Sequence, residues 1–370
     1  MPKNIVVCCD GTANQFAAAK TNVIKLYSAL VQDTSGQVTF YHPGIGTMEP
    51  AGALSPVARK LTKLLGMAVG YGLENDIRDA YAFIMNSYGP EDRIYLFGFS
   101  RGAFTVRVVA SLITMYGLLR KGNEPLIPYV IRMALGIDRA ERSGEEVGAY
   151  FALAKQFRET MSWTAPPIHF AGVWDTVSSV GWIENPLHVP WEADNPNIEI
   201  GRHAVSIDER RAFFRPHLWQ WQDEPPKPHG PRDLKQVWFP GVHCDVGGGY
   251  PEPCSGLSKY ALKWMLDEAK AAGLLVDPLK MLDVLGLSPG SCYTPARPDA
   301  TRHKSLTGPW ILAEFIPKKH RNARKRRWGY RINLFRRRKI KDGSSIHESA
   351  YLLGAKYQKR FPPGAVKVPL

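Results

Sequence analysis

The segment that decides the fold is RIYLFGFSRGAFT, residues 93–105. Its first half is rich in residues that favour β-strands, and it runs into the pattern GFSRG at residues 98–102 before a long apolar stretch that predicts a buried helix. Glycines two positions to either side of a serine are typical of a sharp strand-to-helix turn, where neighbouring backbone leaves no room for side chains. We therefore predict that Ser100 is a nucleophile at the end of a strand; its alternative role is to cap the helix.

Further strand and helix signals alternate along the chain. The predicted strands are residues 5–9, 38–42, 93–98, 168–173 and 237–241. The predicted helices are residues 22–31, 74–87, 105–118 and 258–272. This alternation is typical of a mostly parallel, doubly wound α/β sheet, and we expect a single domain over residues 1–370. Two segments interrupt the pattern, residues 44–71 and 184–232, and we predict that they are insertions that form a lid, line a pocket or pack on the body.

A serine nucleophile needs a base to take its proton and an acid to orient that base. Asp175 and His243 each follow a predicted strand, and they come after Ser100 in the order serine, acid, histidine. Because the carboxyl ends of parallel strands meet at one edge of a sheet, the three side chains are expected to converge. The structural alternatives are a turn aspartate and a hydrogen-bonded loop histidine. His347, in the sequence IHES, is the alternative base.

An acyl-transfer site also needs N–H donors for the oxyanion of its intermediate. The predicted donors are the backbone N–H of Arg101, directly after the serine, and that of Gly11 or Thr12, in the loop after the first strand. The alternative role of this loop is a turn that joins strand to helix. The cysteines lack the paired spacings of a structural zinc site, and the chemistry requires neither a metal nor a cofactor.

The charge of the chain comes from one segment. With 44% hydrophobic residues the chain can form a large core, which excludes a disordered or fibrous protein. Thirteen Lys and Arg and no Asp or Glu lie between Lys318 and Lys341, so this basic segment, residues 318–341, carries +13 of the net charge of +14. For this C-terminal extension we favour a solvated loop or strand pair first, an anionic membrane surface second and nucleic acid last.

No stretch of the sequence predicts a membrane-spanning helix or a secretory signal. The longest apolar run, residues 108–119, falls short of the roughly 20 residues that a spanning helix needs, and the apolar run near the start is too short for a signal peptide. We therefore expect a cytoplasmic protein, or one delivered by a secretion system that needs no signal peptide. The sequence makes no prediction of oligomeric state.

Taken together and in order, seven motifs resemble one family. They are CCDGTAN, YHPGIGT, YLFGFSRGA, FAGVWDTV, DERR, PGVHCDVGGGY and IHES. They resemble bacterial and fungal α/β-hydrolase-like proteins that include the catalytic domain of type VI secretion phospholipase effectors. The resemblance implies an α/β-hydrolase fold in which Ser100, Asp175 and His243 cleave lipid or other carboxylic esters through an acyl-enzyme. The alternative is a non-catalytic binding protein on the same scaffold, with the basic segment as its binding surface.

Overall fold

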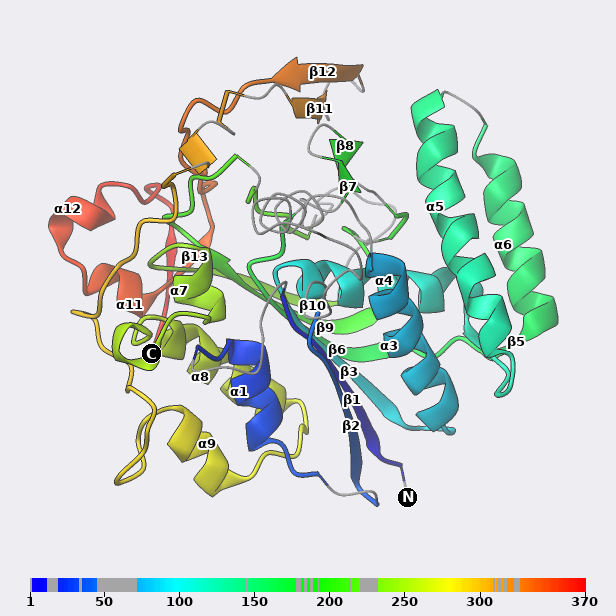
Figure 1. The fold of residues 1–370 in the computed structure, drawn as a ribbon, viewed down its shortest axis with the longest axis horizontal. Helices are drawn as coiled ribbons and strands as arrows, with labels where there is room; N and C mark the ends of the chain where they lie inside the picture. The colour runs from blue at the N-terminus through cyan, green and yellow to red at the C-terminus, as the bar shows by residue number, and fades with distance from the viewer. Residues whose placement is uncertain are drawn as a thin grey trace, which may run out of the picture.

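An eight-stranded sheet forms the centre of the computed structural model of the chain (Figure 1). The structure describes residues 2–11, 19–32, 35–44, 72–143, 146–177, 181–182, 185–186, 189–191, 193–212, 214–219, 232–308, 310–311, 314–315, 318–322 and 327–370. The strand order is β14-β13-β10-β9-β6-β3-β1-β2, and every pairing in this sheet is parallel. Its strands are β1 (Asn4–Cys9), β2 (Gln37–His42), β3 (Arg93–Phe99), β6 (Ile168–Trp174), β9 (Ile198–Ser206), β10 (Asp233–Phe239), β13 (Ser345–His347) and β14 (Val366–Val368).

Helices cover both faces of the sheet, as the alternating sequence pattern predicts. One face carries α3 (Leu73–Ser87), α4 (Arg101–Tyr116), α5 (Ile127–Ser143) and α6 (Gly148–Met161). The other face carries α1 (Asn22–Ala29), α8 (Ser258–Ala271) and α9 (Pro278–Val284). The short helices are α7 (His243–Gly247), α11 (Glu348–Tyr351) and α12 (Ala355–Gln358).

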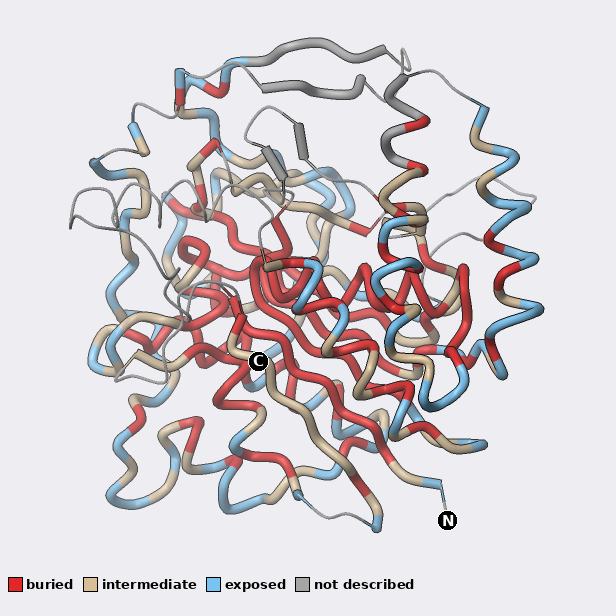
Figure 2. Tube along the Cα trace, turned by 45° about the vertical axis from the view of Figure 1, so that its right-hand side comes forward, coloured by how far each residue is buried: buried red, intermediate tan, exposed pale blue. Residues whose placement is uncertain are grey.

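The sequence of β1 shows why the sheet forms between two helical layers. All six of its residues are buried, and alternate side chains enter opposite cores: Ile5 and Val7 pack with α3 and α4, whereas Val6 and Cys8 pack with α1 and α8. A parallel strand covered on both faces needs a continuous apolar run instead of an alternating one. Figure 2 shows the resulting concentration of buried residues along the strands and the inner sides of the helices.

The structure corrects the predicted insertion over residues 184–232. Residues Ile198–Ser206 of that range form β9, which lies between β6 and β10 inside the sheet. The strand was missed because Arg202 and His203 interrupt its apolar pattern, although both are buried. Arg202 is compensated by ion pairs to Asp233 (2.7 Å) and Glu268 (2.5 Å), which come from other elements. The predicted insertion over residues 44–71 lies outside the described residues except for Gly44.

The C-terminal part also contributes to the sheet, where the sequence gives only a weak pattern. β13 and β14 extend it beyond β10, and Ile346 and Trp238 pack in a small core at that end. Within the basic segment, β11 (Lys318–Asn322) and β12 (Arg327–Arg331) form an antiparallel hairpin, drawn apart from the main sheet at the top of Figure 1. Two further small pairs are β4 (Leu118–Leu119) with β5 (Ser162–Thr164) and β7 (Gly181–Trp182) with β8 (Asn185–Pro186). Among the described residues, no helix is both long enough and apolar enough to span a membrane.

Candidate active site

Ser100 lies on the sharp turn between β3 and α4. Its backbone has φ 58° and ψ −117°, a combination that non-glycine residues rarely adopt and that is concentrated at functional sites. The flanking glycines are required by space: a Cβ at Gly98 would lie 2.5 Å from the carbonyl oxygen of Gly102, and a Cβ at Gly102 would lie 2.1 Å from that of Cys9. The GFSRG pattern therefore forms the strained strand-to-helix turn that the sequence predicts.

Asp175 and His243 are brought together at the carboxyl ends of the strands. Asp175 directly follows β6, which pairs with β3 in a register that sets Trp174 opposite Phe99. His243 begins α7, and its Nδ1 lies 2.6 Å from Oδ2 of Asp175. The aromatic ring of Phe99, next to Ser100, packs on the imidazole of His243 with 4.6 Å between ring centroids. The serine turn and the Asp175–His243 pair thus occupy the same edge of the sheet.

The carboxylate of Asp175 is fully buried and receives hydrogen bonds on both oxygens. Ser206, at the end of β9, donates its backbone N–H to Oδ1 (2.9 Å) and its hydroxyl to Oδ2 (3.1 Å). Arg338 donates from Nη1 to Oδ1 (2.5 Å) and from Nη2 to Oδ2 (3.1 Å). Burial alone would raise the pKa of Asp175, but Arg338 and His243 outweigh it and hold the pKa well below its usual range.

His243 is enclosed on its other sides. Its backbone N–H donates to Oε2 of Glu209 (3.2 Å), and the ring of Phe214 meets the imidazole edge-on at 4.8 Å. Burial lowers the pKa of His243, although the hydrogen bond to Asp175 and the charges of Asp175 and Glu209 oppose this effect. An imidazole that is neutral near pH 7 and donates from Nδ1 to a carboxylate presents Nε2 as a proton acceptor.

The structure describes two of the three predicted oxyanion donors, Arg101 and Gly11. Arg101 is the first residue of α4, where a backbone N–H has no acceptor within the helix. Gly11 lies two residues after β1, but its N–H donates to Oδ1 of its neighbour Asp10 at 2.6 Å. Oδ2 of Asp10 accepts from the hydroxyls of Thr21 (2.6 Å) and Tyr41 (2.8 Å). Thr12, the other predicted donor in this loop, lies outside the described residues.

Two other buried histidines have different partners. His347, the alternative base, ends β13; its Nδ1 lies 2.8 Å from the hydroxyl of Ser349, and burial lowers its pKa to about 4. His203, in β9, accepts the backbone N–H of Thr176 at Nε2 (3.2 Å), and burial lowers its pKa to about 3. Of these three histidines, it is His243 that contacts Asp175 through a hydrogen bond.

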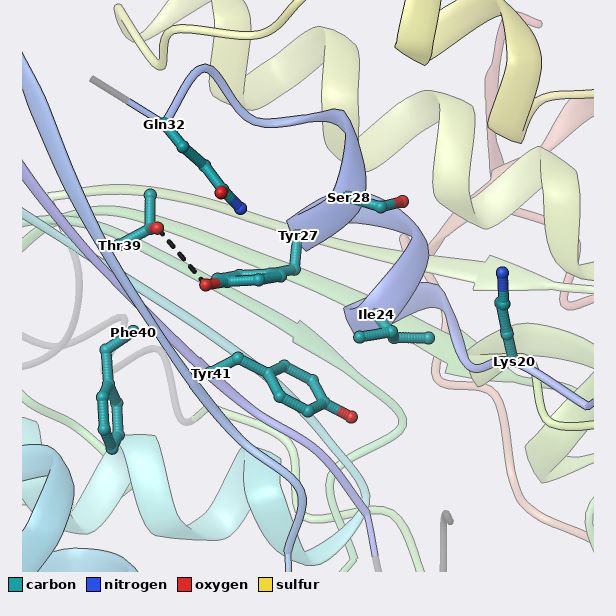
Figure 3. Close-up of a pocket in the computed structure, with 8 residues that line it drawn as sticks. All are labelled: Lys20, Ile24, Tyr27, Ser28, Gln32, Thr39, Phe40 and Tyr41. Atoms are coloured by element: carbon teal, nitrogen blue, oxygen red, sulfur yellow. Dashed lines mark hydrogen bonds between the residues drawn. The ribbon is translucent and has the colours of Figure 1, made fainter. Parts of the chain in front are cut away.

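A pocket of about 590 Å³ lies between α1 and the edge strand β2 (Figure 3). Its lining residues are Lys20, Ile24, Tyr27, Ser28, Gln32, Thr39, Phe40 and Tyr41. The pocket contains none of the predicted catalytic side chains, but Tyr41 links it to Asp10 and thus to the loop after β1. Over the described part of the chain, no three His, Cys, Asp or Glu side chains are grouped as metal ligands would be.

Sequence reasoning missed three residues of this site. Ser206 belongs to strand β9, which the sequence does not predict, and Glu209 lies in the DERR motif, for which the sequence predicts no individual role. Arg338 belongs to the basic segment, for which a solvated surface was the favoured expectation, yet its side chain is 4% exposed. Only the DERR motif offered a signal in the sequence.

Two solved structures and one curated relative are similar to the chain. A crystal structure of an uncharacterized protein from Pseudomonas aeruginosa has a TM-score of 0.46 at 19% identity, covering 76% of this chain and 47% of that one. A structure of the Tle1 effector bound to the VgrG spike from the type 6 secretion system has a TM-score of 0.37 at 19% identity, covering 69% of this chain and 52% of that one. Uncharacterized protein YEL023C from Saccharomyces cerevisiae is 40% identical over 224 residues, 58% of this chain and 32% of that protein.

The chain thus spans about a third of the yeast relative and about half of each of the two solved chains. A family model matches more of this chain than the yeast relative does. The model of the catalytic domain of Tle1-like phospholipase effectors of the type VI secretion system matches residues 3–268. This range holds β1, the serine turn, Asp175 and His243, and the chain therefore belongs to the family of Tle1-like phospholipase effector catalytic domains.

Proposed function

We propose that this protein is a serine hydrolase that cleaves carboxylic esters of lipids through Ser100, His243 and Asp175. The observation that carries the proposal is the 2.6 Å contact between Nδ1 of His243 and Asp175, at the sheet edge where Ser100 occupies its strained turn. Membership of a phospholipase effector family supports a lipid ester as the substrate. We also assign the sheet to the α/β-hydrolase fold, because a serine turn after a central strand and an acid and a histidine after later strands are its pattern.

The first step is attack of the Ser100 hydroxyl oxygen on the ester carbonyl carbon. The proton of the hydroxyl passes to Nε2 of His243, because Nδ1 already carries the proton donated to Asp175. Asp175 stays ionised, since Arg338 and His243 hold its pKa low, and its negative charge stabilises the imidazolium that forms. His243 then returns the proton to the leaving alcohol, and an acyl group remains on Ser100.

The negative charge on the carbonyl oxygen is held by backbone N–H groups. Arg101 donates from the start of α4, where the helix dipole favours an anion. The second donor is the N–H of Gly11 or Thr12 in the loop after β1; in this structure the N–H of Gly11 donates to Asp10. Water, activated by His243, then attacks the acyl group and releases the acid and the free serine. This route uses no metal and no cofactor.

Three further assignments belong to the same proposal. The lipid substrate is reached at an anionic membrane surface, which attracts the basic segment, residues 318–341, through its charge of +13. The protein acts as an effector-like enzyme, as its family membership supports. The non-catalytic alternative, a binding protein that uses the basic segment, predicts that Ser100 does not react with acylating probes.

The test is covalent labelling combined with turnover. A fluorophosphonate probe is expected to label wild type at Ser100, and Ser100→Ala is expected to abolish labelling and ester hydrolysis while leaving the far-ultraviolet circular dichroism unchanged. Loss of a triad member typically reduces kcat by several orders of magnitude. A panel of simple esters, phospholipids and acylated sugars identifies the substrate class. Full turnover of Ser100→Ala on any of them would refute the assignment of the nucleophile.

The two candidate bases provide a matched pair. His243→Gln is expected to eliminate labelling, whereas His347→Gln is expected to retain it, because His347 hydrogen-bonds Ser349 and stacks on Phe239. Both changes replace a buried imidazole, so general destabilisation affects both variants. If His347→Gln alone loses labelling, the base has been misassigned.

A further inference from the structure

Arg338 is the one residue of the described basic segment that the structure brings into contact with Asp175. Its guanidinium binds both carboxylate oxygens, which is the two-pronged geometry that gives arginine–carboxylate pairs their directional strength. The same group donates to the backbone oxygen of Ser206 (3.0 Å) and its hydroxyl (2.7 Å), and to the backbone oxygen of Phe214. Arg338 therefore ties three separate segments around Asp175.

A second observation is that the turn before Arg338 is held by specific hydrogen bonds. Leu334 and Phe335 both have positive φ, 48° and 59°, in the turn that leads to Arg338. Glu314 fixes this turn: its carboxylate is fully buried and accepts from Nδ2 of Asn333 (2.6 Å) and from the backbone N–H of Phe335 (2.9 Å). Two non-glycine residues in this conformation persist only where the surroundings enforce them. The turn directs Arg338 inward, whereas its neighbours Arg336 and Arg337 are exposed.

We propose that Arg338 is a positioning residue for the catalytic acid: it fixes the carboxylate of Asp175 and balances its charge, so that the C-terminal segment completes the active site. This inference rests on the proposed function. Because Asp175 is paired with a permanent cation, its attraction for a proton on His243 is weakened, and His243 remains a neutral base at lower pH. Removing the cation should therefore make His243 easier to protonate.

Several charged or titratable groups face the Asp175–His243 pair from the surrounding elements. They are Arg338 itself, Glu209 and Arg211 in the loop after β9, His203 on β9 and, beside His203, Arg107 on α4. Glu209 and Arg211 form an ion pair of 2.9 Å, so their charges largely cancel. Burial holds the pKa of His203 far below its usual range. Arg211 is paired with Glu209, whereas Arg338 places its positive charge directly on Asp175.

The test compares three variants with wild type. Arg338→Gln removes the charge, Arg338→Lys keeps it without the two-pronged contact, and Arg337→Gln makes the same change at the exposed neighbour. Arg338→Gln is expected to lower kcat about 100-fold with little change in KM, as a displaced catalytic group does. It should also move the acidic limb of the kcat/KM profile to higher pH by about one unit or more. Arg338→Lys should keep the acidic limb of the kcat/KM profile at the wild-type pH but have a lower kcat. Arg337→Gln should match wild type in both kcat and pH profile.

A second measurement does not depend on catalysis. The imidazole of His243, assigned with His243→Gln, is titrated by NMR in the same proteins, and its pKa is expected to rise in Arg338→Gln and stay in place in Arg337→Gln. Should wild type neither hydrolyse esters nor react with a fluorophosphonate, the proposed function fails, but this titration still decides the role of Arg338. Unchanged titration and unchanged kcat in Arg338→Gln overturn the inference, even if its stability falls. If Arg338→Gln does not fold, wild-type kcat in Arg338→Lys overturns it.

Discussion

Glu209→Gln tests whether the base is held in place by a buried charge. The carboxylate of Glu209 is 1% exposed and accepts from the backbone N–H of His243, from the Arg211 side chain (2.9 and 3.0 Å) and from the hydroxyl of Ser305 (2.9 Å). Burial alone would raise its pKa, but the hydrogen bonds and charge of Arg211 lower it from 4.5 to about 2. At 1.36 kcal/mol per pKa unit, this difference corresponds to about 3 kcal/mol of folding stability.

The direction of this pKa shift determines the pH range over which Glu209 stabilises the folded protein. Because the pKa is depressed in the folded protein, the stabilisation is fully present above the ordinary value of 4.5 and is lost as pH falls through about 2. We expect Glu209→Gln to lower the free energy of unfolding by about 3 kcal/mol at pH 7 and by about 2 kcal/mol at pH 3.5, measured by urea denaturation. Ester hydrolysis should also fall, because Gln has one acceptor oxygen in place of two and no charge, so the backbone N–H of His243 competes with Arg211 and Ser305 for it.

The control is Glu159→Gln, a 62% exposed carboxylate 4.0 Å from Lys155 on α6. Exposed pairs of this kind contribute little, so its unfolding curve should follow wild type at both pH values. A stability difference between Glu209→Gln and wild type that is the same at pH 7 and pH 3.5 would contradict the electrostatic explanation. Unchanged hydrolysis would contradict the role of Glu209 in placing His243.

Four other variants have distinct expected outcomes. Glu252 pairs with the fully buried Lys25 and Lys259, so Glu252→Gln should lower the free energy of unfolding, measured by urea denaturation, by about 3–5 kcal/mol. Lys259→Met should lower it less, because Lys25 remains paired with the carboxylate. Asp10→Asn should reduce fluorophosphonate labelling about 10-fold or more without unfolding the protein, because the loop after β1 loses the charged acceptor of three hydrogen bonds. Replacing the basic residues of 318–331 by Gln should weaken binding and hydrolysis of anionic vesicles and leave hydrolysis of a soluble ester unchanged.

The strand ends were predictable from the sequence because each carries its own local signal. Apolar runs that stop at Ser100, Asp175 and near His243 mark where β3, β6 and β10 end, and the flanking glycines mark the turn after β3. The parallel arrangement then follows from the alternation of strands and helices, which brings these ends to one edge. The catalytic candidates could therefore be named before their contacts were known.

β9 could not be predicted in the same way, because its stability depends on partners from distant elements. From the sequence, Arg202 would be expected to face solvent. In the structure it is 4% exposed and paired with Asp233 of β10 and Glu268 of α8. A local pattern contains no information on such compensation, since the cost of burying the charge is offset only when all three elements are folded. Because Ser206 lies at the end of this strand, the sequence also does not predict its hydrogen bond to Asp175.

Arg338 shows how the same limitation affects the definition of the active site. Three consecutive arginines, residues 336–338, are equivalent in composition, and only the turn held by Glu314 distinguishes the one that enters the site. The family model ends at residue 268, so a chain trimmed to that boundary would keep Ser100 and Asp175 but lose the cation that balances the acid. It would also lose β13 and β14, leaving β10 as an unprotected edge. The proposed function therefore predicts that a working catalytic unit of this protein extends through the end of the sheet, and that a deletion of the basic hairpin made to separate membrane binding from catalysis must stop before Arg338.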